Sequence, residues 1–144
     1  MVDVVFVAAD GLSARAVQDH AAAVLQRVIA ALPKSWSVGP LVIARQGRVA
    51  IGDAVAELLQ AECVAILIGE RPGLSAPDSM GAYLTRRPNG NTTDADRNCV
   101  SNIRPAGIGY DDAAFRLTRL LLAMRARKIS GVALKDDSDR PALE

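Results

Sequence analysis

The chain has 144 residues and a formal net charge of +1, with 17 lysine and arginine residues against 16 aspartate and glutamate residues. This length suits one domain, and the balanced charge with only 3% aromatic residues argues against a nucleic-acid binder, which usually has a basic excess and stacking rings. Half of the residues are hydrophobic, which argues against a disordered chain. The apolar runs are shorter than the ~18 residues of a membrane span and the amino terminus resembles a strand more than a signal peptide, so we expect a cytoplasmic protein without a membrane partner.

The hydrophobic pattern predicts strands that alternate with helices. Valine-rich Val2–Ala8 is typical of a strand buried on both faces, and apolar residues at three-and-four spacing predict a helix from Val17 to Leu32. The pattern then predicts, in order, strand Leu41–Ala44, helix Val49–Ala61, strand Val64–Ile68, short strand Gly81–Thr85, helix Tyr110–Lys128 and final strand Ile129–Leu134. Residues 136–144 form a polar tail.

Strands that alternate with helices are joined by right-handed crossovers, which favour parallel pairing. We therefore predict an α/β fold: one three-layer, Rossmann-like domain over residues 1–135, with a mostly parallel sheet flanked by helices. The two cysteines, Cys63 and Cys99, are too few for a disulfide scaffold. Without a CxxC pair, a structural zinc site is not expected.

Three segments should meet beyond the carboxyl ends of the parallel strands, which is where ligands bind in such sheets. They are Ala9–Ser13, Gln46–Val49 and Gly69–Ser79. The polar loop predicted at Arg87–Gly109 is long enough to have a function and should join them. Because the sequence lacks GxGxxG and GxxxxGK[ST], a phosphate-binding loop is not expected. The mixed polar and apolar side chains of residues 92–105 allow a cradle for a large polar ligand as one of two interpretations.

Single residues in these segments have more than one interpretation. Glu70 emerges directly after a strand, where its carboxylate could accept hydrogen bonds from a ligand or pair with Arg71 or Arg104. Asp94 and Asp96 are possible metal ligands, but a third ligand at suitable spacing is missing. The interpretation without a ligand is a loop whose polar side chains satisfy one another in Asx turns.

Four stretches of the sequence resemble a known family. They are ADGLSARAVQDHA near the amino terminus, ILIGERPGLSAPDSMGAYLTRRP, TTDADRNCVSNIRPAGIGYDDAAFRL and SGVALKD near the end. Together they are similar to the small (light) subunit of ethanolamine ammonia-lyase, and the resemblance covers nearly the whole chain. The GERPGL and ADRNCVSNI segments are specific, because no common fold requires their residue order. The resemblance also implies a further, largely helical N-terminal segment in family members, which we expect to be absent from this chain.

The resemblance implies a function. The family enzyme converts ethanolamine to acetaldehyde and ammonia with adenosylcobalamin. Its large subunit, a TIM barrel, holds the substrate, and its small subunit shares the interface that binds the cofactor. Cofactor contacts of the small subunit carry over onto Val49, Glu70 and Cys99. The implied partners are the large subunit and adenosylcobalamin, and packaging in a bacterial microcompartment stays open.

The chain is not expected to supply a catalytic residue or a ligand to cobalt. His20, the single histidine, lies on the apolar face of a predicted helix, which favours a packed structural residue over a catalytic base. Many cobalamin enzymes ligate cobalt through the histidine of a DxHxxG motif, and the adjacent Asp19 and His20 do not match it. In the family, dimethylbenzimidazole of the cofactor itself has that role, so the radical chemistry belongs to the cofactor.

Two other functions compete with this interpretation. One is a stand-alone Rossmann-like module that binds a small molecule, and the other is an independent phosphate or nucleotide-sugar enzyme, which lacks the expected glycine loop. A subunit would also need a partner-facing surface, for which we select Arg86, Arg87, Arg97 and Arg104. The alternative for these arginines is a solvated basic face.

Overall fold

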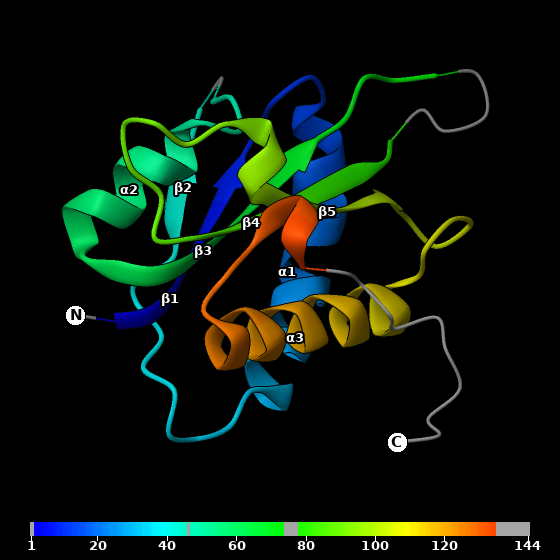
Figure 1. Ribbon diagram of the computed structural model, residues 1–144. Coiled ribbons are helices and arrows are strands. Elements are labelled where there is room, and N and C mark those ends of the chain that lie inside the picture. The colour runs from blue at the N-terminus through cyan, green and yellow to red at the C-terminus, as the bar shows by residue number, and fades with distance from the viewer. Residues whose placement is uncertain (1, 46, 74–77, 135–144) are drawn as a thin grey trace.

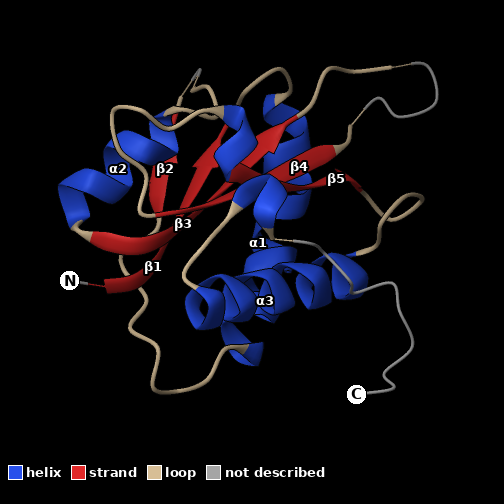
Figure 2. Cartoon of the chain, viewed as in Figure 1, coloured by secondary structure: helices blue, strands red, loops and turns tan. Residues whose placement is uncertain are grey.

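The computed structural model describes residues 2–45, 47–73 and 78–134, in which a five-stranded sheet carries helices on both faces (Figures 1 and 2). The strands are β1 (Val2–Ala9), β2 (Val42–Ala44), β3 (Ala61–Gly69), β4 (Met80–Arg86) and β5 (Arg97–Ile103), in the order β2-β1-β3-β4-β5 across the sheet. The helices are α1 (Ala14–Ala31), α2 (Ile51–Leu59) and α3 (Tyr110–Arg127), with short 3-10 helices η1 (Asp94–Asp96) and η2 (Gly131–Ala133).

The sheet is mixed, so the prediction of a mostly parallel sheet is wrong. Strand β1 pairs parallel with β2 and with β3, but β4 pairs antiparallel with both β3 and β5. The physical reason is the connection between β3 and β4, because a parallel pair needs a crossover of roughly a dozen residues or more, usually with a helix. Residues 70–79 are too few for such a crossover.

Two further predictions fail near the carboxyl end. The predicted loop Arg87–Gly109 contains strand β5, which forms the outer edge of the sheet. The predicted final strand Ile129–Leu134 is instead a turn followed by η2. Gly131 has a φ of +89°, and a Cβ there would lie 2.1 Å from the carbonyl oxygen of Ala95, so this segment packs as a tight turn against η1. The predicted tail, residues 136–144, lies outside the described residues.

Alternate residues of the central strands build two apolar layers. Val4 and Phe6 of β1 face α1 and α3, while Val5 and Val7 face α2. All four are at most 3% exposed, which is typical of a strand buried on both faces. Figure 1 shows α2 on one side of the sheet, apart from α1 and α3.

The helix ends follow from their sequences. The hydroxyl of Ser13 accepts a hydrogen bond from the backbone N–H of Ala16 at 3.2 Å, which caps α1. Helix α3 begins with Asp111 and Asp112 and ends with Arg125 and Arg127, charges that suit the dipole at each end. Within the described part of the chain, no helix is long and apolar enough to cross a membrane.

Helix α2 is short, so it covers only part of its side of the sheet. Its nine residues pack on β1 and β3, so β4 and β5 extend beyond it on that side of the sheet. Tyr83 and Cys99 are paired residues of these two strands and lie in line with Ile66 of β3, on the α2 side. This part of the sheet face is therefore open beside the amino terminus of α2.

Candidate functional site

A cavity of about 580 Å³ lies at the carboxyl ends of β1 and β3. Residues 11–12 after β1, residues 47–49 before α2, residues 69–71 after β3 and Tyr83 of β4 line it, together with Ile68. The three segments expected to meet at this edge therefore do meet there. Val49 and Glu70 line the same cavity, whereas Gln46 and residues 74–77 lie outside the described residues.

The loops at this edge are packed tightly. The backbone N–H of Leu12 donates to the carbonyl of Gly69 at 3.0 Å. Gly11 has a φ of +57°, and a Cβ on it would lie 2.6 Å from the same carbonyl oxygen. A Cβ on Gly69 would lie 1.9 Å from the carbonyl oxygen of Ser13. Only glycine fits at either place, so the floor of the cavity is fixed by two backbones in direct contact.

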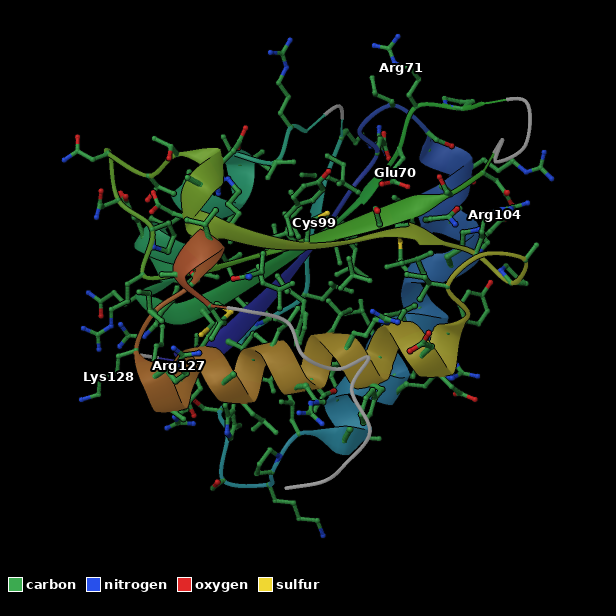
Figure 3. The ribbon with its side chains drawn as sticks, turned by 45° about the vertical axis from the view of Figure 1, so that its right-hand side comes forward. Glu70, Arg71, Cys99, Arg104, Arg127 and Lys128 are labelled. Atoms are coloured by element: carbon green, nitrogen blue, oxygen red, sulfur yellow. The ribbon has the colours of Figure 1, made fainter. Side chains whose placement is uncertain are left out.

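The carboxylate of Glu70 is held from two directions. Its Oε1 accepts a hydrogen bond from the hydroxyl of Ser79 at 2.8 Å and another from the backbone N–H of Asn102 at 3.0 Å. Among the described residues, neither Arg71 nor Arg104 forms the ion pair with Glu70 that the sequence left open. Arg71 is exposed and extends away from the sheet (Figure 3), and the Nε of Arg104 lies 3.5 Å from Asp78.

Cys99 lies in the middle of β5, opposite Tyr83, and not at the end of a strand. Desolvation by burial raises the pKa of Cys99 above its ordinary value, and the interaction with the side chain of its pair residue Tyr83 opposes this rise. Burial also raises the pKa of Tyr83 to about 12, and the negative charge of Glu70 adds to the shift. Tyr83 therefore connects the cavity that holds Glu70 to the open face that holds Cys99.

A buried ion pair ties α2 to β5 across this face. The guanidinium of Arg97 donates to both carboxylate oxygens of Asp53, at 2.6 and 2.8 Å, and to the hydroxyl of Thr85 at 3.2 Å. The Arg97 side chain is 6% exposed and that of Asp53 is 16% exposed. The hydrogen bond and the charge of Asp53 raise the pKa of Arg97. The pair forms one wall of the open face next to Cys99.

Three of the four arginines selected for a partner-facing surface form ion pairs within the domain. Of the four, Arg87 alone belongs to the exposed class. Arg97 is held by Asp53, and Arg86 pairs with Glu62 at 3.2 Å, where both side chains are 14% exposed. These side chains are occupied within the domain, so a partner could reach them only in part.

The remaining sequence candidates have structural contacts. Asp94 lies 3.2 Å from the Nε of Arg97, and the carboxylate of Asp96 accepts from the backbone N–H of Thr93 at 2.9 Å. No three His, Cys, Asp or Glu side chains gather as a possible metal site within residues 2–45, 47–73 and 78–134. His20 is 3% exposed, and its ring nitrogens contact the Tyr110 hydroxyl at 2.6 Å and the Asp78 carbonyl at 2.9 Å. His20 thus joins α1, α3 and the start of β4.

The sequence analysis did not single out Ser79, Tyr83 or Asn102, although Ser79 and Asn102 lie in the segments Gly69–Ser79 and Arg87–Gly109 that it placed at the site. Tyr83 had a signal, because it shares one face with Gly81 and Thr85 in a strand that the pattern did predict. The roles of Ser79 and Asn102 had no signal, since Ser79 reaches Glu70 through the pairing of β3 with β4 and Asn102 through the pairing of β4 with β5. Met80 pairs with Ile103, but Ala82 pairs with Val100, so Ser101 and Asn102 together oppose one residue. This bulge, with a φ of +58° at Asn102, turns the Asn102 N–H toward Glu70.

The chain was compared with known proteins. A family model described as "Ethanolamine ammonia-lyase light chain (EutC)" matches residues 1–135. The ethanolamine ammonia-lyase small subunit of Xanthomonas campestris pv. campestris (strain B100) is 56% identical over 142 residues, which are 98% of this chain and 52% of that protein. The small subunit of Rhodopseudomonas palustris (strain BisA53) is 56% identical over 137 residues, or 94% of this chain and 52% of its own.

A third relative has the same relation to the chain. The ethanolamine ammonia-lyase small subunit of Pseudomonas aeruginosa (strain UCBPP-PA14) is 51% identical over 144 residues, which are 99% of this chain and 53% of that protein. The chain thus spans about half the length of the curated relatives it matches.

Proposed function

The chain belongs to the ethanolamine ammonia-lyase light-chain family, and on this premise we propose that it acts as a small subunit of an adenosylcobalamin-dependent ethanolamine ammonia-lyase. The holoenzyme would be a carbon–nitrogen lyase that converts ethanolamine to acetaldehyde and ammonia. This chain would contribute to the cobalamin site at its interface with a catalytic large subunit. One observation carries the proposal. Val49 and Glu70 line one cavity, and Tyr83 connects that cavity to Cys99 on the adjoining open face.

The residues present fit the chemistry of a corrin ring, which is broad and has an apolar body fringed with amide side chains. The cavity and the adjoining open sheet face offer apolar and polarisable contacts at Val49, Tyr83 and Cys99. Glu70 supplies a carboxylate that accepts hydrogen bonds from amide N–H groups. The backbone N–H of Val49 has no acceptor among the described residues, so it is available to a ligand carbonyl. A flat ligand would therefore meet one charged acceptor and one donor above an apolar floor.

The cofactor would supply the radical chemistry when bound, and this chain would bind and orient it. The contacts of His20 support this division of roles, because both ring nitrogens already have partners inside the domain. We therefore propose that His20 would not ligate cobalt and that this chain would hold the cofactor through Val49, Glu70 and Cys99. We also propose a cytoplasmic holoenzyme, with packaging in a microcompartment as a separate question for the source organism.

Co-expression with an ethanolamine ammonia-lyase large subunit tests the proposal. The complex is analysed by size-exclusion chromatography, and ethanolamine deamination is assayed with and without adenosylcobalamin. We expect one co-eluting complex whose activity requires the cofactor, while the chain alone is inactive. A second co-expression uses the chain extended by the N-terminal segment of a relative, because the chain spans about half of the relatives' length.

The outcomes separate the competing functions. A chain that elutes alone in both experiments and binds adenosylcobalamin without a partner would favour the stand-alone binding module. A chain that deaminates ethanolamine alone would contradict a purely binding role. Glu70→Gln keeps the size of the side chain and removes its charge, so we expect a higher KM for adenosylcobalamin. Asp94→Asn is the matched control, since the Asp94 side chain is 99% exposed and lies outside the cavity lining.

A further inference from the structure

Ser79, which directly precedes β4, forms two hydrogen bonds with Glu70. The backbone N–H of Glu70 donates to the carbonyl of Ser79 at 3.0 Å, so the ladder of β3 and β4 continues past its last pair, Gly69 and Met80. The Ser79 hydroxyl then donates to Oε1 of Glu70 at 2.8 Å. Ser79 is only 5% exposed. A buried hydroxyl needs a partner, and here its partner is the carboxylate at the cavity.

The second donor comes from β5, the strand beyond β4. The bulge in β5 aims the backbone N–H of Asn102 at the same Oε1, at 3.0 Å. Two donors from different elements therefore hold one oxygen of Glu70. Its Oε2 accepts no hydrogen bond within the described residues and lies 3.0 Å from the position of a Cβ built on Gly81. The free oxygen thus lies over a glycine, on the side of the sheet that carries Tyr83.

We infer that Ser79 is a positioning residue for the cofactor site: with the Asn102 N–H it fixes Oε1 of Glu70, so that Oε2 accepts an amide N–H of the ligand. This inference rests on the function proposed above. A glutamate side chain has several rotatable bonds, and ordering it at the moment of binding costs conformational entropy. A carboxylate already held at one oxygen avoids this cost and offers the other oxygen in a fixed place.

Removal of the Ser79 hydroxyl should therefore weaken cofactor binding and leave the chemistry unchanged. Ser79→Ala in the complex with the large subunit is expected to raise the dissociation constant of adenosylcobalamin about tenfold, or about 1.4 kcal/mol. The dissociation constant is measured by equilibrium dialysis, followed by the absorbance of adenosylcobalamin. The kcat for ethanolamine at saturating cofactor should stay within twofold. Ser101→Ala is the matched control, because Ser101 is exposed on β5 and its hydroxyl forms no hydrogen bond with the described residues.

A double-mutant cycle distinguishes positioning from a general structural role. If Ser79 acts through Glu70, Ser79→Ala should change the dissociation constant less than twofold in a Glu70→Ala background. Additive losses would overturn the inference. Ser79→Ala that binds like the wild type, while Glu70→Ala binds weakly, would also overturn it and leave the proposed function standing. Glu70→Ala that binds like the wild type would instead count against the proposed cofactor contact itself.

A measurement on the free chain keeps the inference testable without the complex. Hydrogen exchange of the Asn102 amide reports its bond to Oε1. We expect Glu70→Ala to lower the protection of this amide strongly, and Ser79→Ala to lower it in part. If Ser79→Ala fails to fold, Ser79→Cys is used, because a thiol is nearly the same size and a weaker donor. Unchanged protection in both Ser79 variants would show that the hydroxyl does not hold the carboxylate.

Discussion

Arg97→Ala should destabilise the domain far more than the loss of an ordinary surface arginine. The guanidinium bonds both oxygens of Asp53, and the two side chains are only 6% and 16% exposed. Breaking a buried pair from one side costs about 3–5 kcal/mol, because the remaining charge loses its partner. Asp53 keeps some contact with water, so we expect about 3 kcal/mol. In a chain of this length that loss lowers the Tm by ~10 °C.

Urea denaturation and thermal melts of matched variants measure this effect. Arg15→Ala is the control, because the Arg15 and Asp19 side chains are 81% and 46% exposed and such a pair contributes less than about 0.5 kcal/mol. The Arg97→Ala and Asp53→Ala double variant should lose less free energy of unfolding than the sum of the single variants. An Arg97→Ala variant no less stable than Arg15→Ala would refute the reasoning.

Three further predictions concern the two thiols and a glycine. Burial raises the pKa of Cys63 from 9.0 to about 12, so its contribution to stability is complete below pH 9 and is lost as the pH rises from 9 to 12. Urea melts of Cys63→Ala should therefore decline less over this range, and an equal decline would contradict the assignment; the decline that remains belongs in part to Tyr83. Iodoacetamide at pH 8 should alkylate Cys99 before Cys63, and Tyr83→Phe should slow the reaction, since the interaction with Tyr83 lowers the Cys99 pKa; mass spectrometry reads both rates, and faster labelling of Tyr83→Phe would contradict this. Gly69→Ala should cost about 4 kcal/mol or more because of its backbone clash, whereas Gly90→Ala, with nothing within 4 Å of the added Cβ, should melt like the wild type.

The elements that the sequence predicted well are those with a strong hydrophobic period. Val2–Ala8 reads as a strand because both faces are buried, and the structure extends it by one residue to Ala9. The helix predicted over Tyr110–Lys128 spans Tyr110–Arg127. Its apolar residues recur every three or four positions, which is the main sequence signal for a helix.

Strand β5 shows why the rest could not be predicted. It is an edge strand in which Val100 and Ile103 alone are buried, so the period of two that identifies a half-buried strand is missing. The bulge at Ser101 and Asn102 interrupts the alternation further. Conversely, Ile129–Leu134 is apolar enough for a strand. However, the Asn98 side chain donates a hydrogen bond to the carbonyl of Gly131 and accepts one from its backbone N–H, so these groups are not available to a strand partner.

The prediction that three segments meet at one edge of the sheet is confirmed despite the error in topology, and the reason is physical. The edge prediction needed only β1, β2 and β3 to be parallel, and they are. The missed antiparallel pairs then add to the same edge, because they bring the start of β4, at Ser79, and the end of β5, at Asn102, beside Glu70. A crossover helix between β3 and β4 would have placed neither donor there, and it would have covered the sheet face that Tyr83 and Cys99 leave open. The antiparallel pairing of β4, which the sequence analysis did not predict, therefore holds the Glu70 carboxylate in place and leaves the sheet face at Tyr83 and Cys99 open.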